Sequence, residues 1–330
     1  MRIALVYNQP LPSRYSALGE HGAVAGVLEA VEAVERALLA TGHTVTRLGL
    51  QPPLANALAT VPRLQADLVF NLFEGFDGCP ETEGLVAQAL EASGHPVTGA
   101  SRATLDLCLD KGQAKEQLRA KGVPTPPWRL LDGERSRGCA LDFPLIVKPL
   151  REDASHGIGP RSVVKDPQAL ADQVDWVGEW FGTPVLVERF LKGREFNVTG
   201  LGDRPPQVLP PSEMVYGSQA YGSRLLTYAA KWLPDDDAYR AADVRCPAEV
   251  SRGLARQINA LAVAACQAVG SPPYARVDLR CDGRGRPYVL EVNPNPDLSP
   301  GAGVATQARA AGWEYERLIG AIVDLALAKS

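Results

Sequence analysis

Apolar and polar residues alternate along two segments near the C-terminus, residues 274–281 and 286–292. Successive side chains of a β-strand point to opposite faces, so this pattern predicts two strands that are apolar on one side only. The residues between them, 282–285, read Asp-Gly-Arg-Gly and are typical of a hairpin turn. The pattern therefore predicts a β-hairpin with one packed face and one polar face.

The register of this hairpin decides which side chains share a face. If Cys281 pairs with Arg286 across the turn, Arg276 lies opposite Glu291. The packed face then carries Val277, Leu279, Leu290 and Val292. The polar face carries Arg276, Asp278, Glu291 and Asn293. We therefore expect a guanidinium and several oxygen donors to meet on one side of the sheet.

The residue types on the polar face predict a binding site. The oxygen donors Asp278, Glu291 and Asn293 suit Mg²⁺, and the adjacent Arg276 suits a phosphoryl or oxyanion group. The ordinary alternative is a surface hairpin whose polar face is hydrated. Two features count against it: the packed side is rich in large and β-branched residues, and the strand runs directly into Pro-Asn-Pro at 294–296, which fixes the chain exit.

The remaining apolar pattern predicts an α/β chain. Strands are predicted at residues 2–7, 43–48, 67–72, 143–148 and 185–188, and helices at 24–39, 83–92, 110–121 and 315–328. Strands that alternate with helices near the N-terminus are typical of a doubly wound parallel sheet. Residues 205–222 are rich in Pro, Gly and Ser and predict a loop over the site. We place domains at 1–102, 103–187 and 188–330.

Composition limits the function classes. With 330 residues and a net charge of −4, the chain has no bulk attraction for nucleic acid or an anionic membrane. The six cysteines form no CxxC pair, which favours reduced thiols in the cytoplasm over a disulfide frame or zinc site. No stretch approaches the roughly 18 apolar residues of a membrane span, and residues 1–7 predict a strand, not a signal peptide.

Several strand ends carry groups suited to a nucleotide. Lys148 ends an apolar strand and is followed by a Gly/Ser loop, residues 152–159, whose backbone N–H groups could approach phosphate oxygens. Glu195 follows another strand and could accept from ribose hydroxyls. Taken singly, these residues have ordinary alternatives: Glu195 could be a surface glutamate, Lys111 a solvated lysine at a helix start, and Lys231 an exposed lysine at a strand end.

The order of these groups is more specific than any one of them. Asp110-Lys111, Lys148-Pro149, Glu188-x-x-Leu191, Lys231 and the hairpin together resemble the ATP-grasp superfamily, and within it the D-alanine–D-alanine ligase family. The resemblance implies three α/β domains, with the central and C-terminal α+β domains clasping ATP. It also implies two Mg²⁺ ions, for which Mn²⁺ could substitute, and the joining of a carboxylate to an amine with formation of ADP and phosphate. Small amino acids or amines would be the substrates, and a homodimer the assembly.

The resemblance also implies roles for individual residues. The nucleotide would be held by Lys111 and Lys148 at the phosphates, by Glu188, Arg189, Phe190 and Leu191 at adenine, by Glu195 at ribose, and by Ser155, Gly157 and Lys231 at the transferring phosphate. Asp278, Glu291 and Asn293 would be the metal ligands, and Arg276 would stabilise the oxyanion of the intermediate. Catalysis would therefore rest on Arg276, Ser155 and Lys231.

The positions expected to bind amino acids depart from the family pattern. Glu20 stands near the place of a glutamate that holds the first substrate's ammonium, with altered spacing, and Glu74 replaces a histidine. Ala154 and Trp232 replace a serine and a tyrosine, and Ala302-Gly303 replaces the Ser-Leu pair that meets the second substrate's carboxylate. Ser299 or Glu20 could take over the lost contacts.

The substrate pair is therefore open. D-Ala–D-Ala is the family default, another dipeptide or a secondary-metabolite amide is the alternative, and a nucleotide-binding module without turnover is a further one.

Overall fold

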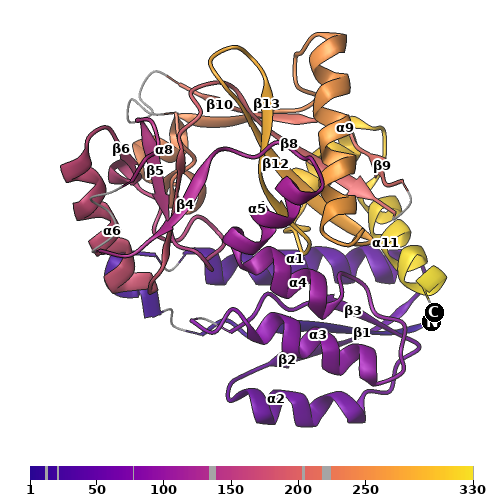
Figure 1. Ribbon diagram of the computed structural model, residues 1–330. Helices are drawn as coiled ribbons and strands as arrows, with labels where there is room; N and C mark the ends of the chain where they lie inside the picture. The colour runs from indigo at the N-terminus through magenta and orange to yellow at the C-terminus, as the bar shows by residue number, and fades with distance from the viewer. Residues whose placement is uncertain are drawn as a thin grey trace.

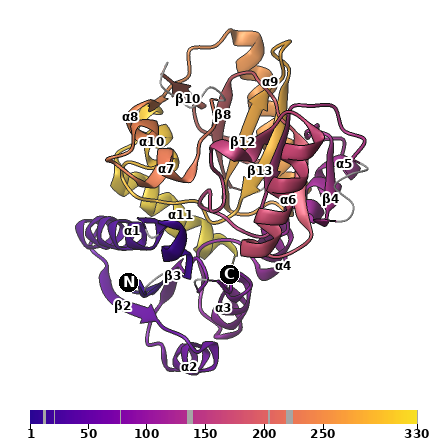
Figure 2. The same cartoon turned by 90° about the vertical axis from the view of Figure 1, so that its left-hand side faces the viewer.

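The computed structural model describes residues 1–11, 14–20, 22–76, 78–133, 139–202, 205–217 and 224–329. Within these residues the strands form three sheets (Figure 1). Figures 1 and 2 show the N-terminal sheet on one side of the molecule and the other two sheets together on the opposite side. This arrangement, with one parallel and two antiparallel sheets, confirms the predicted fold class.

The N-terminal sheet is parallel and covered on both faces. Its order is β2 (Thr44–Leu50), β1 (Arg2–Asn8) and β3 (Leu68–Leu72). Alternate residues of β1 enter different cores: Leu5 packs with α1 (Gly22–Ala40) and α11 (Tyr315–Lys329), whereas Val6 packs with α2 (Leu54–Thr60) and α3 (Thr82–Ala92). The strand is apolar throughout because both of its faces are buried, as in other doubly wound sheets.

The central sheet is antiparallel, in the order β4 (Trp128–Leu131), β7 (Val185–Arg189), β5 (Leu145–Lys148) and β6 (Val163–Val164). Helix α6 (Pro167–Phe181) covers one face through residues such as Leu170 and Val174. Asp166 caps this helix by accepting from the backbone N–H of Ala169 at 2.9 Å. The packing of α6 therefore supports β5 and β7 on one face of the sheet.

The C-terminal sheet holds the predicted hairpin. It comprises β11 (Ala242–Arg245), β10 (Ser212–Tyr216), β8 (Glu195–Leu201), β12 (Tyr274–Cys281) and β13 (Pro287–Asn293), with β9 (Gln207–Val208) paired to β8. Helix α9 (Arg252–Ala268) covers its apolar face. The remaining helices are η1 (Arg14–Leu18), η2 (Val61–Arg63), α4 (Arg102–Leu109), α5 (Lys111–Ala120), η4 (Pro160–Ser162), α7 (Tyr228–Trp232), α8 (Asp237–Arg240) and α10 (Gly303–Ala310).

The predicted hairpin register is wrong, although the predicted polar face is right. Cys281 pairs with Pro287 instead of Arg286, and the register shifts once more at a bulge between Asp278 and Leu279. Two shifts of one residue add up to two, which returns every side chain of the polar face to the same side. Arg276 consequently lies opposite Asn293 instead of Glu291.

The bulge also corrects the packed face. Val289, not Leu290, packs with Val277, Leu279 and Val292 against α9. Leu290 is the extra residue of the bulge, and its side chain lines the larger of the two cavities described below. A bulge cannot be inferred from alternation, because alternation assumes that each residue faces one partner.

The predicted loop at 205–222 is also wrong in part. Its described residues include the two strands β9 and β10, and β10 lies between β8 and β11 in the sheet. Residues 218–222 lie outside the described part of the chain. Pro206, Pro210 and Pro211 lie beside these strands and not within them, which is where proline is tolerated in a sheet.

One core joins the two ends of the chain. Leu318, Ile319 and Ile322 of α11 pack in the same cluster as Leu5 of β1. The C-terminal helix therefore anchors the N-terminal sheet beneath the other two sheets. Among the described helices, none combines the length and the apolar character that crossing a bilayer requires. The domain boundaries at residues 102 and 187 remain predictions.

Candidate active site

Two cavities meet where the three sheets approach one another. The larger, of about 730 Å³, is lined by residues of the central and C-terminal sheets, including Lys148 and Glu195. The smaller, of about 570 Å³, lies between the N-terminal domain at Glu74 and the chain after the hairpin at Asn295. Both cavities are lined by Lys231, Trp232, Arg276 and Asn293. Groups bound in the two cavities can therefore approach each other at this junction.

The structure brings nearly all the predicted nucleotide and metal residues to the larger cavity. They are Lys111, Lys148, Ser155, Glu188, Arg189, Phe190, Leu191, Glu195, Lys231, Arg276, Asp278, Glu291 and Asn293. Gly157 is the exception, because it does not line this cavity. Its backbone N–H donates to Glu20 at 3.2 Å, and a side chain at this position would collide with Phe181.

A buried carboxylate links two lysines at the floor of the larger cavity. Glu188 lies 2.6 Å from the ammonium of Lys115 and 2.6 Å from that of Lys148. Burial alone would raise the pKa of Glu188, but the two ammonium groups outweigh it and lower that pKa to about 2. Burial lowers the pKa of Lys115, although Glu188 opposes the change. Lys148 is the member of this cluster that lines the cavity together with Glu188.

Sequence reasoning missed Lys115. A signal existed, because Lys111 and Lys115 are four residues apart on α5 and share one face of the helix. Both are buried, so the ordinary alternative of a solvated Lys111 does not hold. The Lys111 ammonium donates to the backbone carbonyl of Glu152 and lies 3.7 Å from Asp153, which ties α5 to the loop that follows β5.

The polar face of the hairpin forms a compact network. Arg276 donates to both carboxylate oxygens of Asp278, at 2.7 and 2.9 Å. Asn197 of β8 donates to Asp278 at 2.7 Å. Burial opposes the charge of Arg276, but the adjacent Asp278 carboxylate prevails and raises the pKa of the guanidinium. Arg276 is therefore held in place as a permanent cation at the junction of the two cavities.

The donor set on this face fits a magnesium ion. Asp278 and Glu291 are direct cross-strand partners, and Asn293 lies two residues further along β13. Two carboxylates and an amide oxygen are ligands that Mg²⁺ accepts, with phosphate oxygens completing its coordination. Among the described residues, no group of three or more His, Cys, Asp and Glu side chains could hold a metal ion, so an amide or a substrate oxygen has to complete such a site.

Lys231 is not at the end of a strand, as the isolated sequence suggested, but in the short helix α7. Thr227 caps this helix by accepting from the backbone N–H of Ala230 at 3.1 Å. The ammonium lies 4.9 Å from the ring centre of Trp232. Burial, reinforced by the charge of Arg276, lowers the pKa of Lys231. An anion bound beside this half-buried amine would therefore stabilise its protonated form.

The loop after β5 lies over the larger cavity. Ala154 and Ser155 adopt left-handed backbone angles, with φ of 54° and 64°. The indole N–H of Trp232 donates to the carbonyl of Ala154 at 2.8 Å. The two positions where the resemblance predicted a lost serine and tyrosine, Ala154 and Trp232, are thus joined by a contact to a backbone oxygen.

Glu20 contacts the same loop over the larger cavity. Its carboxylate lies 2.8 Å from Nδ1 of His156, and it also accepts from the backbone N–H of Gly157. Tyr15 of η1 stacks on the His156 ring with centroids 4.9 Å apart. Glu20 is buried and lines neither cavity. The structure therefore does not place it where a substrate ammonium would be bound.

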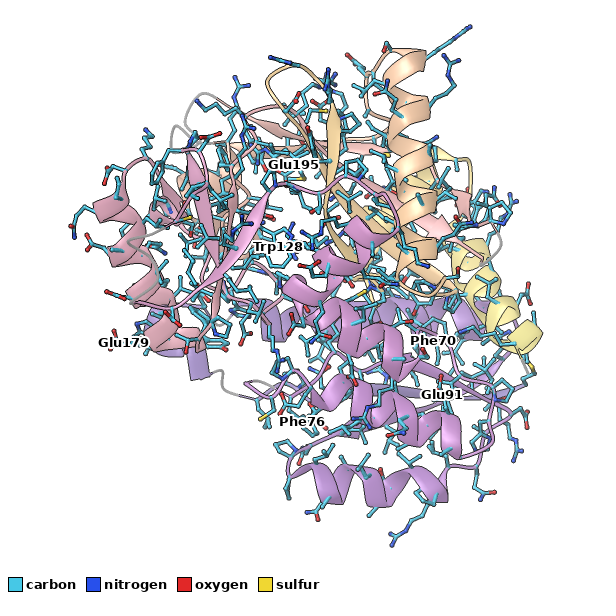
Figure 3. All side chains as sticks on the ribbon, viewed as in Figure 1. Phe70, Phe76, Glu91, Trp128, Glu179 and Glu195 are labelled. Atoms are coloured by element: carbon cyan, nitrogen blue, oxygen red, sulfur yellow. The ribbon has the colours of Figure 1, made fainter. Side chains whose placement is uncertain are left out.

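The predicted hinge begins at the end of β7 in the central sheet, and the predicted ribose residue begins β8 in the C-terminal sheet. Figure 3 labels Glu195 at the beginning of β8 and Trp128 at the beginning of β4, which belong to the two sheets that border the larger cavity. Glu195 accepts from the hydroxyl of Tyr216 at 2.9 Å and from Arg280 at 2.8 Å. Burial raises the pKa of Glu195, although Arg280 opposes the change.

The smaller cavity has a different chemical character. Its walls include the carboxylates of Glu74, Glu83 and Asp297. Ser299 is buried, and its hydroxyl donates to Asp297 at 2.6 Å. Ala302 and Gly303 border the larger cavity and offer no side-chain hydroxyl. The two groups predicted to take over the clamp are engaged within the protein, Ser299 with Asp297 and Glu20 with His156.

Comparison with known families points in one direction. Residues 118–324 match the family model described as the D-ala D-ala ligase C-terminus. An uncharacterized protein of Sinorhizobium fredii, y4sG, is 36% identical over 259 residues, covering 78% of this chain and 74% of its own. A D-alanine–D-alanine ligase of the same organism is 31% identical over 293 residues, covering 87% of this chain and 89% of its own.

Solved structures agree on the fold. The D-alanine–D-alanine ligase of Bacillus anthracis superimposes with a TM-score of 0.77 at 22% identity, covering 100% of this chain and 98% of its own. The same enzyme complexed with ATP gives a TM-score of 0.75, with the same identity and coverage. These structures share the architecture, and the sequence relatives carry the family relationship.

Proposed function

Because the chain belongs to the D-alanine–D-alanine ligase family of ATP-grasp enzymes, we propose that it joins a carboxylate to an amine through an acyl phosphate. It is an ATP-dependent carboxylate–amine ligase. In the proposed reaction a carboxylate oxygen takes the γ-phosphoryl group and ADP leaves. The neutral amine then attacks the acyl carbon and forms the C–N bond. The bond between the acyl carbon and the phosphate oxygen breaks, so that phosphate leaves, and the nitrogen gives up a proton.

The observation that best supports this proposal is the meeting of the two cavities. ATP in the larger cavity would bring its γ-phosphate to the junction, and a substrate in the smaller cavity would bring its reacting group to the same place. Lys148, which Glu188 holds at 2.6 Å, would stand beside the phosphates. Holding the reacting groups together lowers the entropic part of the barrier.

We assign the charge-stabilising roles to groups that stand at this junction. Arg276 would donate to the oxyanion of the tetrahedral intermediate, and Lys231 would pair with the transferring phosphoryl group. Asp278, Glu291 and Asn293 would hold Mg²⁺, which would neutralise phosphate charge when bound. The bidentate contact between Arg276 and Asp278 keeps the guanidinium oriented before substrate arrives.

We further propose that free D-alanine is a poor acceptor. A carboxylate beside Ala302 and Gly303 would find no hydroxyl to donate to it, and an anion that loses its partners on binding pays a large desolvation cost. Ser299 and Glu20 are already engaged with Asp297 and the loop. D-Ala–D-Ala formation is the competing reading, and efficient dipeptide formation, with kcat/KM near 10⁴ M⁻¹s⁻¹ or above, would support it.

The test is a screen for phosphate release. The purified chain is supplied with ATP, Mg²⁺ and pairs of amino acids or amines, and products are identified by mass spectrometry. We expect release that depends on both a carboxylate and an amine, together with a product heavier than either. A chain that binds ATP but shows no substrate-dependent release with any pair would instead be a nucleotide-binding module without turnover.

A further inference from the structure

We infer that Arg280 is a positioning residue for the ribose of the bound nucleotide: it fixes one carboxylate oxygen of Glu195, so that the other oxygen accepts from a single ribose hydroxyl. This inference rests on the proposed function, because it places the nucleoside of ATP beside Glu195 in the larger cavity. Arg280 lines that cavity together with Phe190 and Glu195, which the resemblance assigns to adenine and ribose. Arg280 itself was not among the predicted site residues.

The pairing of β8 with β12 brings Arg280 to the cavity. The two strands pair without a break in register, and Arg280 lies directly opposite Glu195, which Figure 3 labels. Arg280 is two residues beyond Asp278, so both side chains share one face of β12, whereas Leu279 between them packs in the core. A guanidinium and a carboxylate are thus cross-strand partners on the face that borders the cavity.

The guanidinium of Arg280 is engaged within the protein. Nη1 donates to Oε2 of Glu195 at 2.8 Å, and Nη2 donates to the backbone carbonyl of Arg224 at 2.6 Å. The guanidinium carbon lies 4.7 Å from the centre of the Phe190 ring, which is a cation–π distance. Only 4% of the side chain is exposed. Because its donors are turned toward the protein, Arg280 would act on a ligand through Glu195.

The hydrogen bonds that the structure describes for the Glu195 side chain all end on one oxygen. Oε2 accepts from Arg280 and, at 2.9 Å, from the hydroxyl of Tyr216. Among the described residues no donor reaches Oε1, and Oε1 is not one of the buried polar atoms that lack a partner. A carboxylate with both oxygens open could accept from two adjacent ribose hydroxyls. Glu195 instead presents one open oxygen to the cavity that it lines.

Arg280 also favours the charged form of this carboxylate. Burial raises the pKa of Glu195, and the charge of Asp278 adds to the rise. Arg280 is the strongest opposing influence, ahead of Tyr216 and Lys148. A charged oxygen accepts a stronger hydrogen bond than a neutral one. Without Arg280, the carboxylate would lose its main counter-charge as well as its fixed orientation.

The competing explanation is an ion pair that only joins β8 to β12. Such a pair offsets the loss of hydration best when further hydrogen bonds satisfy the remaining atoms of both partners. Here Nε of Arg280 is buried without a hydrogen-bond partner among the described residues, and Oε1 of Glu195 is left to the cavity. The arrangement thus favours an oriented acceptor over a pair optimised for stability.

The test compares ATP with 2′-deoxy-ATP and 3′-deoxy-ATP. Dissociation constants are measured by calorimetry, with Mg²⁺ and without amino acids or amines, for the wild type, Arg280→Met and Arg280→Lys. Methionine removes the charge, and lysine keeps it without the planar fork. Arg284→Met is the matched control, because Arg284 is exposed in the turn of the same hairpin and lines neither cavity. A paired variant, Glu195→Gln with Arg280→Met, removes both charges and leaves no buried ion unpaired if the single variant does not fold.

We expect the wild type to lose about tenfold in affinity with one of the two analogues, as for a lost hydrogen bond to a charged group, and much less with the other. Arg280→Met and the paired variant should bind all three nucleotides nearly equally, Arg280→Lys should keep part of the preference, and Arg284→Met should match the wild type. Equal losses with both analogues, no preference in the wild type, or a full preference in Arg280→Met or the paired variant would overturn the inference. So would a variant that weakens all three nucleotides by the same factor, as a merely structural pair would.

The two proposals fail separately. A wild type that binds all three nucleotides equally, yet releases phosphate when a carboxylate and an amine are added, would remove the role of Arg280 and leave the ligase function standing. The expected hydroxyl preference without any substrate-dependent phosphate release would contradict the ligase function alone.

Discussion

The two cavities differ in how their carboxylates are partnered. In the larger one, Glu188 is paired with both Lys115 and Lys148 at 2.6 Å, and the predicted nucleotide and metal residues line the walls. In the smaller one, Glu83 accepts a hydrogen bond from Asn295, and no described hydrogen bond or ion pair engages the Glu74 carboxylate. The nucleotide is the same for every ATP-dependent ligase, whereas the substrates distinguish one ligase from another. We therefore expect contacts that distinguish substrates to lie in the smaller cavity.

The largest expected effect concerns the carboxylate of the larger cavity. Glu188→Gln removes the carboxylate that pairs with both Lys115 and Lys148 and leaves two buried ammonium groups close together. We expect a loss of about 3 kcal/mol in the free energy of unfolding, as for other broken buried ion pairs. Denaturant unfolding measures it. A variant as stable as the wild type would mean that water already neutralises this cluster.

The next effect concerns turnover. Glu291→Ala removes one of the oxygen donors of the hairpin, and we expect phosphate release to fall by roughly two decades or more, because a positioned cation neutralises the transferring phosphoryl group. The packed face with Val277 and Val289 is unchanged, so the melting temperature should stay close to that of the wild type. Near-normal activity at saturating Mg²⁺ would remove Glu291 from the metal site.

Arg276→Lys tests the junction itself. The charge is kept, but the planar fork that donates to both oxygens of Asp278 is lost. We expect kcat to fall on the order of 100-fold with little change in the KM for ATP, because the lost donor serves developing charge. If only the KM for ATP rises, Arg276 contacts the nucleotide and does not act at the reaction centre.

The two cavities also differ in how much of each the sequence could predict. Motifs at strand ends located the larger cavity, because the strand pattern fixes which face a side chain joins. The hairpin polar face was correct even though its register was not, since the turn and the bulge each shift the pairing by one residue. Lys115 was missed because its spacing of four residues from Lys111 places it on the same helix face but does not say that it is buried, which its contact with Glu188 shows.

The smaller cavity was harder to predict. It is assembled from β3, α3 and the chain after β13, which are far apart in sequence, so no local pattern links Glu74 to Asp297. The position of Glu20 was also unpredictable. The family resemblance suggested a substrate contact despite the altered spacing, whereas the fold turns this carboxylate toward His156 and the loop. Tertiary contacts of this kind depend on how the domains meet, which alternation and capping do not encode.

The smallest expected effect is opposite in sign to that of Glu188→Gln, and it compares the carboxylates of Glu74 and Glu188 directly. Glu74 has a pKa raised to about 7, so the folded chain binds its proton more tightly than the unfolded chain does, and stability is lost as the pH rises from the ordinary value of 4.5 through about 7. Glu188 has a lowered pKa, and its contribution is present at neutral pH and disappears only as the pH falls toward about 2. At pH 8, Glu74→Gln should therefore raise the apparent melting temperature of the ligand-free chain, whereas Glu188→Gln should lower it.

The rise should be small, about 2 °C, because Glu74 is open to the cavity and solvent screens its charge. Melting curves at pH 5 and pH 8 measure it, and the advantage of Glu74→Gln over the wild type should shrink at pH 5, where the native carboxyl is already protonated. A variant that is destabilised at pH 8 would show that Glu74 already has a favourable partner. With the expected result, the uncompensated charge of Glu74 is a cost that the ligand-free folded chain bears, as is common where binding sites trade stability for function.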